Sequence, residues 1–89
     1  MKVIKFGAAW CAGCLIMKPI WEEIENERAW LKTEYYDYDE NQEIAEQYSV
    51  DEKLPTFIFL DKNEQEIMRL QGEISKKELI KIIEEYKDK

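Results

Sequence analysis

Histidine is absent from this chain of 89 residues, and cysteine occurs only twice. A structural zinc site needs about four nitrogen or sulfur ligands. One copy of the chain does not supply that set, so we expect no metal site within it. A metal or iron–sulfur cluster shared between two chains stays open, although nothing in the sequence requires one.

Long apolar runs and clustered basic residues are also missing. No apolar stretch approaches the ~20 residues of a membrane span, and no cleavage site follows the charged, strand-like start of the chain. The 20 acidic and 13 basic residues give a net charge of −7, which disfavours nucleic acid and anionic membranes as partners. We therefore expect residues 1–89 to form one cytoplasmic, monomeric domain that binds neither nucleic acid nor membranes.

The two cysteines that are present lie close together, in Trp10-Cys11-Ala12-Gly13-Cys14. This run follows a strand-like segment and precedes a helical pattern. The spacing lets the two sulfurs close a small disulfide ring, and the N–H groups and positive dipole of a helix N-terminus favour a thiolate on the first cysteine. A loop this short constrains the unfolded chain little, so a purely structural disulfide is disfavoured. The pattern predicts a redox site at Cys11 and Cys14.

Apolar spacing and turn residues indicate an α/β fold. The chain reads strand, helix, strand, short helix, strand, strand, helix. The strands are predicted at residues 2–7, 34–38, 56–60 and 66–70, the first helix at about 11–28, the short helix after Asp39 or Asn41, and the last after the capping box Ser75–Glu78. This order predicts a central mixed four-stranded sheet flanked by helices, βαβαββα.

Four motifs, in order and at matching spacing, resemble the thioredoxin family over essentially the whole chain. They are Trp10-Cys11-x-x-Cys14, Pro19 at the family's helix-kink position, Leu54-Pro55-Thr56, and Gly72 before the last helix. The chain lacks the N-terminal strand and helix of a full-length thioredoxin, so it is similar to the minimal core shared with glutaredoxins. The resemblance implies the thioredoxin fold.

The resemblance also implies an activity. It predicts a thiol–disulfide oxidoreductase that reduces protein disulfides, with the cysteine pair as its redox centre, no other cofactor, and a thioredoxin-reductase-like flavoprotein as electron donor. Cys11 is expected to be the more exposed, attacking thiolate and Cys14 the more buried, resolving thiol.

Two alternatives stay open. One is a glutaredoxin-like protein recharged by glutathione, although Gln71-Gly72-Glu73-Ile74 stands where a glutaredoxin has Gly-Gly-x-Asp. The other is a binding module or metallochaperone whose cysteines hold a partner or a soft metal such as Cu(I).

Four residues are expected to bind substrate. By the resemblance, the Leu54–Pro55 peptide is cis, and its backbone would pair with an extended substrate strand; the simpler interpretation of Pro55 is a strand-start proline. Trp10 is expected in the substrate platform, whereas a packed aromatic role suits Trp21 and Trp30 better. Gly72 either leaves room for substrate backbone or is a loop glycine.

Three residues are expected to tune the redox chemistry. Lys5 stands where thioredoxins carry a buried aspartate, and Tyr35 where they often carry a lysine. A Lys5 ammonium would stabilise a cysteine thiolate, a neutral Lys5 would act as a base, or the side chain would reach water or pair with Glu34 or Asp37. Ala12-Gly13 replaces the family's Gly-Pro, which influences the redox potential in the family.

Overall fold

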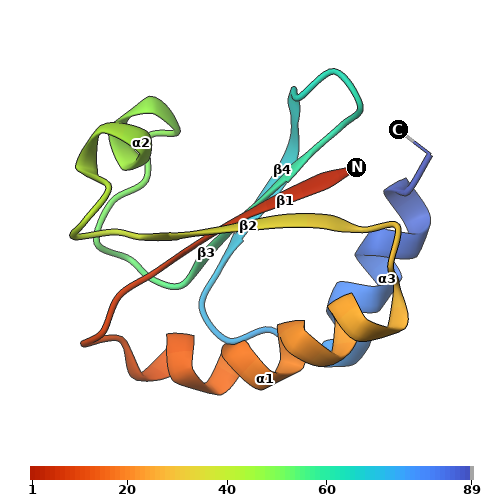
Figure 1. Ribbon diagram of the computed structural model, residues 1–89, viewed down its shortest axis with the longest axis horizontal. Coiled ribbons are helices and arrows are strands. Elements are labelled where there is room, and N and C mark those ends of the chain that lie inside the picture. Colours follow the sequence, from red (N-terminus) through yellow and green to blue (C-terminus); the bar gives the residue numbers. More distant parts are fainter. Residues whose placement is uncertain (89) are drawn as a thin grey trace.

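The structure is a computed structural model that describes residues 1–88. Its elements follow the predicted order (Figure 1). They are β1 (Lys2–Gly7), α1 (Ala12–Glu27), β2 (Lys32–Asp37), α2 (Gln42–Gln47), β3 (Thr56–Leu60), β4 (Glu66–Gln71) and α3 (Lys76–Tyr86).

The four strands form one mixed sheet with the order β2-β1-β3-β4. β1 pairs in parallel with β2 and antiparallel with β3, and β4 is antiparallel to β3. The parallel pair is joined by the α1 crossover, while a short turn suffices for the β3–β4 hairpin. The predicted mixed four-stranded sheet is confirmed.

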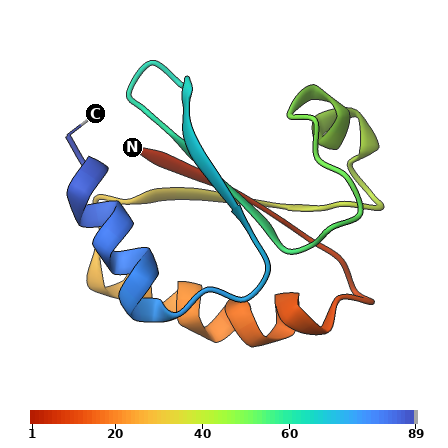
Figure 2. The same cartoon turned by 180° about the vertical axis from the view of Figure 1, so that it is seen from behind.

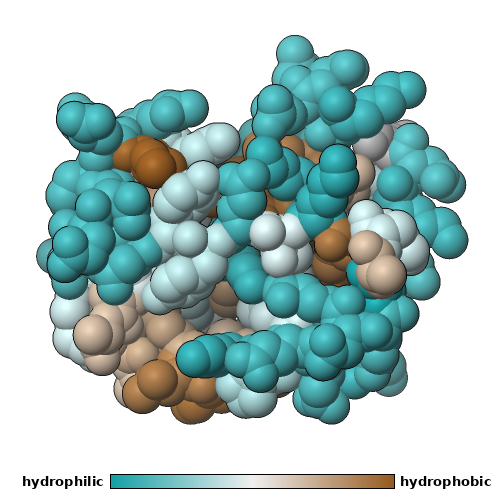
Figure 3. All heavy atoms as spheres, in the orientation of Figure 1, coloured by the Kyte–Doolittle hydropathy of each residue, from teal (hydrophilic) through white to brown (hydrophobic). Residues whose placement is uncertain are grey.

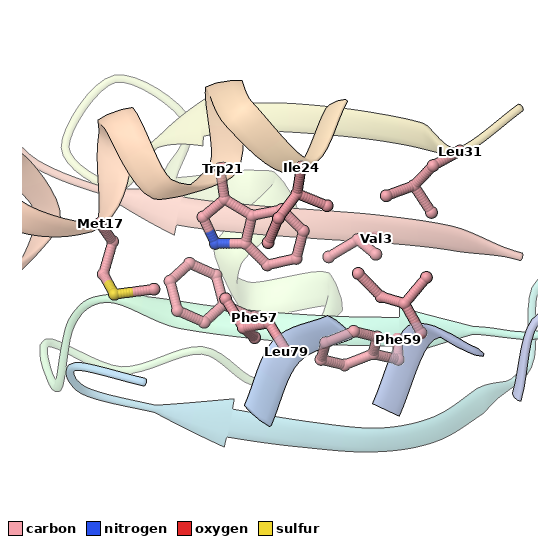
Figure 4. Packing of buried hydrophobic residues seen from close by; sticks show 9 residues of the cluster. Val3, Met17, Trp21, Ile24, Leu31, Phe57, Phe59 and Leu79 are labelled. Atoms are coloured by element: carbon pink, nitrogen blue, oxygen red, sulfur yellow. The ribbon is translucent and has the colours of Figure 1, made fainter. Parts of the chain in front are cut away.

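One face of the sheet is covered by α1 and α3, as Figure 1 and the reverse view in Figure 2 show. Side chains alternate along a strand, so every second residue of β1 and β3 points to these helices. The resulting core joins residues of the sheet to residues of both helices: Val3, Phe57, Phe59, Met17, Trp21, Ile24, Leu31, Leu79 and Ile83 (Figure 4).

The opposite face carries α2 and the loop after it (Figure 1). Here the intervening residues of β1 and β3 pack together with Ala45 and Val50: Ile4, Phe6, Ile58 and Leu60. All five residues of β3 are buried, as expected for an apolar strand covered on both faces.

The predicted caps of α2 and α3 have different outcomes. The Ser75 hydroxyl accepts a hydrogen bond from the Glu78 N–H at 3.2 Å, so the predicted cap of α3 is confirmed. Asn41 occupies the N-cap position of α2 without a side-chain capping bond. Trp30 is exposed rather than packed, because it lies in the turn after α1, which corrects the expectation for that residue.

Residues 1–88 contain neither a membrane-spanning helix nor a cluster of metal-ligating side chains. No helix in this range is both long enough and apolar enough to cross a bilayer. No group of three or more His, Cys, Asp or Glu side chains in the same range is placed to hold a metal ion.

Candidate active site

Cys11 and Cys14 form a disulfide at the start of α1. Cys11 is the N-cap residue, and its Sγ accepts a hydrogen bond from the Cys14 N–H at 3.2 Å. The Cys11 N–H in turn bonds to the Ala8 carbonyl at 3.1 Å, which holds the β1–α1 loop against the helix. A helix N-terminus carries unpaired N–H groups and a partial positive charge. This geometry stabilises negative charge on the Cys11 sulfur.

The exposure of the two cysteines is the reverse of the predicted order. Cys11 is only 5% exposed, whereas Cys14 is half-buried. The Cys11 N–H bonds back to the Ala8 carbonyl in the preceding loop, while Cys14 lines an open cavity beside β1. The expectation of an exposed Cys11 and a buried Cys14 is therefore wrong for this disulfide state.

Trp10 and Leu15, on either side of the disulfide motif, contribute exposed apolar surface. Trp10 is 57% exposed, and its indole N–H donates to the Asp39 carboxylate at 2.8 Å. Leu15 and Ile16, in the first turn of α1, are exposed as well. Figure 3 shows hydrophobic surface at its lower left, over the start of α1. Asp39 thus holds Trp10 in place at the mouth of the site.

Leu54 and Pro55 lie on the other side of the motif. The Leu54–Pro55 peptide is cis, as predicted. A Cβ atom placed on Gly13 would lie 3.2 Å from Pro55 Cδ, so the α1 N-terminus and Pro55 are in close contact. The Pro55 carbonyl accepts the Gly72 N–H at 2.9 Å, which brings the β4–α3 loop to the same place.

Gly72 and Ala12 complete the predicted set around the motif. Gly72 has φ +89°, a backbone conformation that favours glycine. No atom lies within 4 Å of a Cβ placed there, so the space above it is open. Ala12 is exposed at the first position of α1. The structure thus brings Trp10, Ala12, Gly13, Pro55 and Gly72 together around the disulfide.

Lys5 forms an ion pair that sequence analysis missed. Its Nζ lies 2.5 Å from Glu25 Oε2 and 5.5 Å from the centre of the Trp21 ring. The prediction that Lys5 pairs with Glu34 or Asp37 is wrong. Glu34 points to the opposite face of β2, as alternation along the strand requires, and it pairs with Lys2 at 2.8 Å.

Asp37 is engaged elsewhere. Its carboxylate accepts the backbone N–H groups of Asp39 and Glu40 at 2.9 and 3.1 Å.

The partner of Lys5 was hard to foresee because Glu25 comes from the far end of α1, and only the packing angle of that helix brings it over β1.

Replacing Lys5 by Met tests what this pair does. Glu25 keeps the Thr33 hydroxyl bond at 3.0 Å but loses its cation. Because the pair is partly exposed, we expect the free energy of unfolding to fall by about 1 kcal/mol in urea denaturation. The double variant Lys5→Met/Glu25→Gln removes both charges of the pair, so the thiolate absorbance of its reduced form should titrate at nearly the wild-type pH. A large shift of that titration would instead assign the pair a direct tuning role.

A cavity of about 410 Å³ lies behind Cys14, between α1, β1 and β2. Its lining includes Lys5, Gly7, Trp21, Glu25 and Tyr35. In the sequence Tyr35 stands out only by its alignment with a family lysine, and the structure places it in the lining of the cavity beside the redox pair. The site therefore combines a helix-capped disulfide, an exposed apolar rim and, behind the second cysteine, a largely apolar cavity that Lys5, Glu25 and Tyr35 also line.

Comparisons with known proteins agree with this geometry. The family model described as Thioredoxin matches residues 1–85. A thioredoxin of Malassezia sympodialis is 38% identical over 72 residues, covering 79% of this chain and 67% of that protein. A thioredoxin of Chlamydia trachomatis is 36% identical over 84 residues, covering 94% of this chain and 80% of that protein.

Solved structures give the same result. Thioredoxin 1 of Thermosipho africanus superposes with a TM-score of 0.84 at 35% identity, covering 97% of this chain and 93% of that one. The chain spans about half to two thirds of the length of the first curated relatives that it matches. The chain belongs to the thioredoxin family of thiol–disulfide oxidoreductases.

Proposed function

We propose that this protein reduces disulfide bonds in other proteins through the Cys11–Cys14 dithiol. The observation that carries the proposal is the position of the pair, at the N-terminus of α1 and beside the cis Leu54–Pro55 peptide. Trp10, Leu54, Pro55 and Gly72 form the substrate platform. Residues 1–89 act as one domain, and the pair is the only redox centre that the reaction needs.

Cys11 is the attacking residue in this proposal, despite its low exposure. Support comes from the Cys14 N–H, which points at Cys11 Sγ and stabilises a thiolate there. The Cys11 thiolate attacks one sulfur of the substrate disulfide, and the other substrate sulfur leaves as a thiolate and takes a proton from water.

The Cys14 thiolate then resolves the mixed disulfide. It attacks Cys11 Sγ, the Cys11–substrate bond breaks, and the second substrate thiolate takes a proton from water. The Cys11–Cys14 bond forms, and two electrons have passed from the dithiol to the substrate.

Substrate backbone is expected to bind at Leu54. Within residues 1–88, Leu54 makes no backbone-to-backbone hydrogen bond, so its N–H and carbonyl are free to pair with an extended substrate. Ala12 and Gly13 lie in the first turn of α1, where their conformational freedom would influence the redox potential.

Recharging the dithiol requires an electron donor. We propose a thioredoxin-reductase-like flavoprotein, with this protein acting as a monomer. Such a cycle belongs in a reducing compartment, because an oxidising one would keep the disulfide closed. On this basis the proposed location is the cytoplasm.

An insulin-type disulfide reduction assay tests the function. The protein would be supplied with NADPH and a thioredoxin reductase in one reaction, and with glutathione, NADPH and glutathione reductase in another. We expect turnover in the first reaction and little in the second. Turnover only with glutathione would contradict the proposed donor, and no turnover even with dithiothreitol as reductant would contradict the reductase function itself.

A further inference from the structure

The Tyr35 hydroxyl and the Cys14 sulfur converge on the same glycine. A Cβ atom placed on Gly7 would lie 2.8 Å from Tyr35 Oη and 3.3 Å from Cys14 Sγ. Gly7 is the last residue of β1, and Tyr35 pairs with Lys5 in the neighbouring strand. The absence of a side chain at Gly7 therefore lets the tyrosine hydroxyl approach the second cysteine.

The other titratable groups around this cavity come from β1, β2 and α1. They are Lys5, Asp37, Lys18, Glu22 and Glu25. Lys5 and Glu25 neutralise each other, and the Asp37 carboxylate accepts the backbone N–H groups of the following loop. Lys18 and Glu22 are exposed on the helix surface. Tyr35 differs from these groups, because its hydroxyl lies beside Gly7, where the Cys14 sulfur lies as well.

The hydroxyl of Tyr35 is suited to donate a hydrogen bond. Burial of the hydroxyl, followed by the nearby Asp37 charge, raises the pKa of Tyr35 above its ordinary value of 10.0. Tyr35 is exposed as a whole residue, but its hydroxyl end lies against Gly7. The phenol therefore keeps its proton at neutral pH, and it acts as a donor rather than as a base.

We propose that the Tyr35 hydroxyl donates a hydrogen bond to the Cys14 thiolate and so stabilises the nucleophile that resolves the mixed disulfide. This inference rests on the proposed function for its place in the reaction. In the disulfide form Cys14 Sγ is bonded to Cys11. Reduction breaks that bond and frees Cys14 Sγ to turn towards the cavity and Tyr35.

The chemistry of the resolving step then differs from base catalysis. The Cys14 thiol loses its proton to water at the open mouth of the cavity, and Tyr35 retains its own proton throughout. A hydrogen bond to the charged form lowers the pKa of Cys14 and raises the fraction of reactive thiolate.

The test is the pH dependence of Cys14 alkylation in a chain that also carries Cys11→Ser. With a single thiol, the profile reports Cys14 alone. Adding Tyr35→Phe removes the donor, and we expect the pKa of Cys14 to rise by about one unit. Because nucleophilicity rises with thiol pKa, the alkylation rate at neutral pH should fall about threefold while the high-pH plateau rises about threefold.

Tyr36→Phe is the matched control. It removes the same atom from the next residue of β2, but the Tyr36 hydroxyl bonds to Glu34 at 2.7 Å on the opposite face. We expect its profile to match the parent. Identical profiles for both variants, or a lower Cys14 pKa in Tyr35→Phe, would overturn the proposal. Because alkylation needs neither substrate protein nor reductase, this outcome is independent of the reductase assay.

Discussion

Replacement of Cys14 by Ser is expected to stop turnover and to trap the protein on its substrate. Cys11 can still attack a disulfide, but the bond that forms is no longer resolved within the molecule. Intramolecular attack by a positioned group has a very high effective concentration. Resolution by external thiol at millimolar concentration should therefore be slower by at least about a thousandfold.

The trapped species is measured directly. Reduced Cys14→Ser protein is mixed with a protein disulfide, quenched with acid, and separated on a non-reducing gel, where a covalent adduct should accumulate and disappear on reduction. Cys11→Ser is the matched control and should form little adduct. The reverse result, with adduct only in Cys11→Ser, would assign the attack to Cys14. That outcome deserves a direct test, since Cys14 is the more exposed residue in the disulfide form.

Phe59→Ala is expected to have the largest effect on stability. Phe59 lies in β3 with no exposed surface and packs in the core beneath α1 and α3, near Trp21 at 6.4 Å between ring centres. Removing a buried phenyl ring leaves a cavity that the surrounding core fills only in part. We expect a loss of about 4 kcal/mol in the free energy of unfolding, and a melting temperature lower by roughly 20 °C.

Urea and thermal unfolding of the reduced protein measure this loss. Leu15→Ala serves as the control, because Leu15 is 68% exposed and its truncation should change stability by less than about 0.5 kcal/mol. A loss below about 1 kcal/mol for Phe59→Ala would contradict the packing of β3 against α1 and α3.

Most of the fold could be predicted because its elements carry local signals. Residues 56–60 form an unbroken apolar run, and β3 has the bounds predicted for it. β2 begins at Lys32, two residues before the predicted start at residue 34, because Lys32 and Thr33 pair with Lys2 and Val3 through the backbone. Backbone pairing of this kind depends on the neighbouring strand, so the side-chain pattern of residues 32–33 does not predict it.

The candidate site could be predicted only in part. The cysteine pair and the cis Leu54–Pro55 peptide follow from short motifs. The Lys5–Glu25 pair depends on how α1 lies across β1, and the approach of Tyr35 to Gly7 depends on the register between β1 and β2. The burial of Cys11 likewise depends on how the β1–α1 loop folds back against the helix, where the Cys11 N–H bonds to the Ala8 carbonyl. Contacts between elements that are distant in the sequence cannot be inferred from the spacing of residues within either element.

An equilibrium redox titration of the Cys11–Cys14 pair measures whether it is a reversible, thioredoxin-like redox centre. The protein would be equilibrated with dithiothreitol buffers of defined ratio, and the dithiol fraction measured by thiol alkylation. We expect one reversible two-electron transition with a midpoint at about −250 mV or lower, in the range of thioredoxin. A pair that never forms a reversible disulfide, or a midpoint near −120 mV as in a strong oxidant, would contradict it.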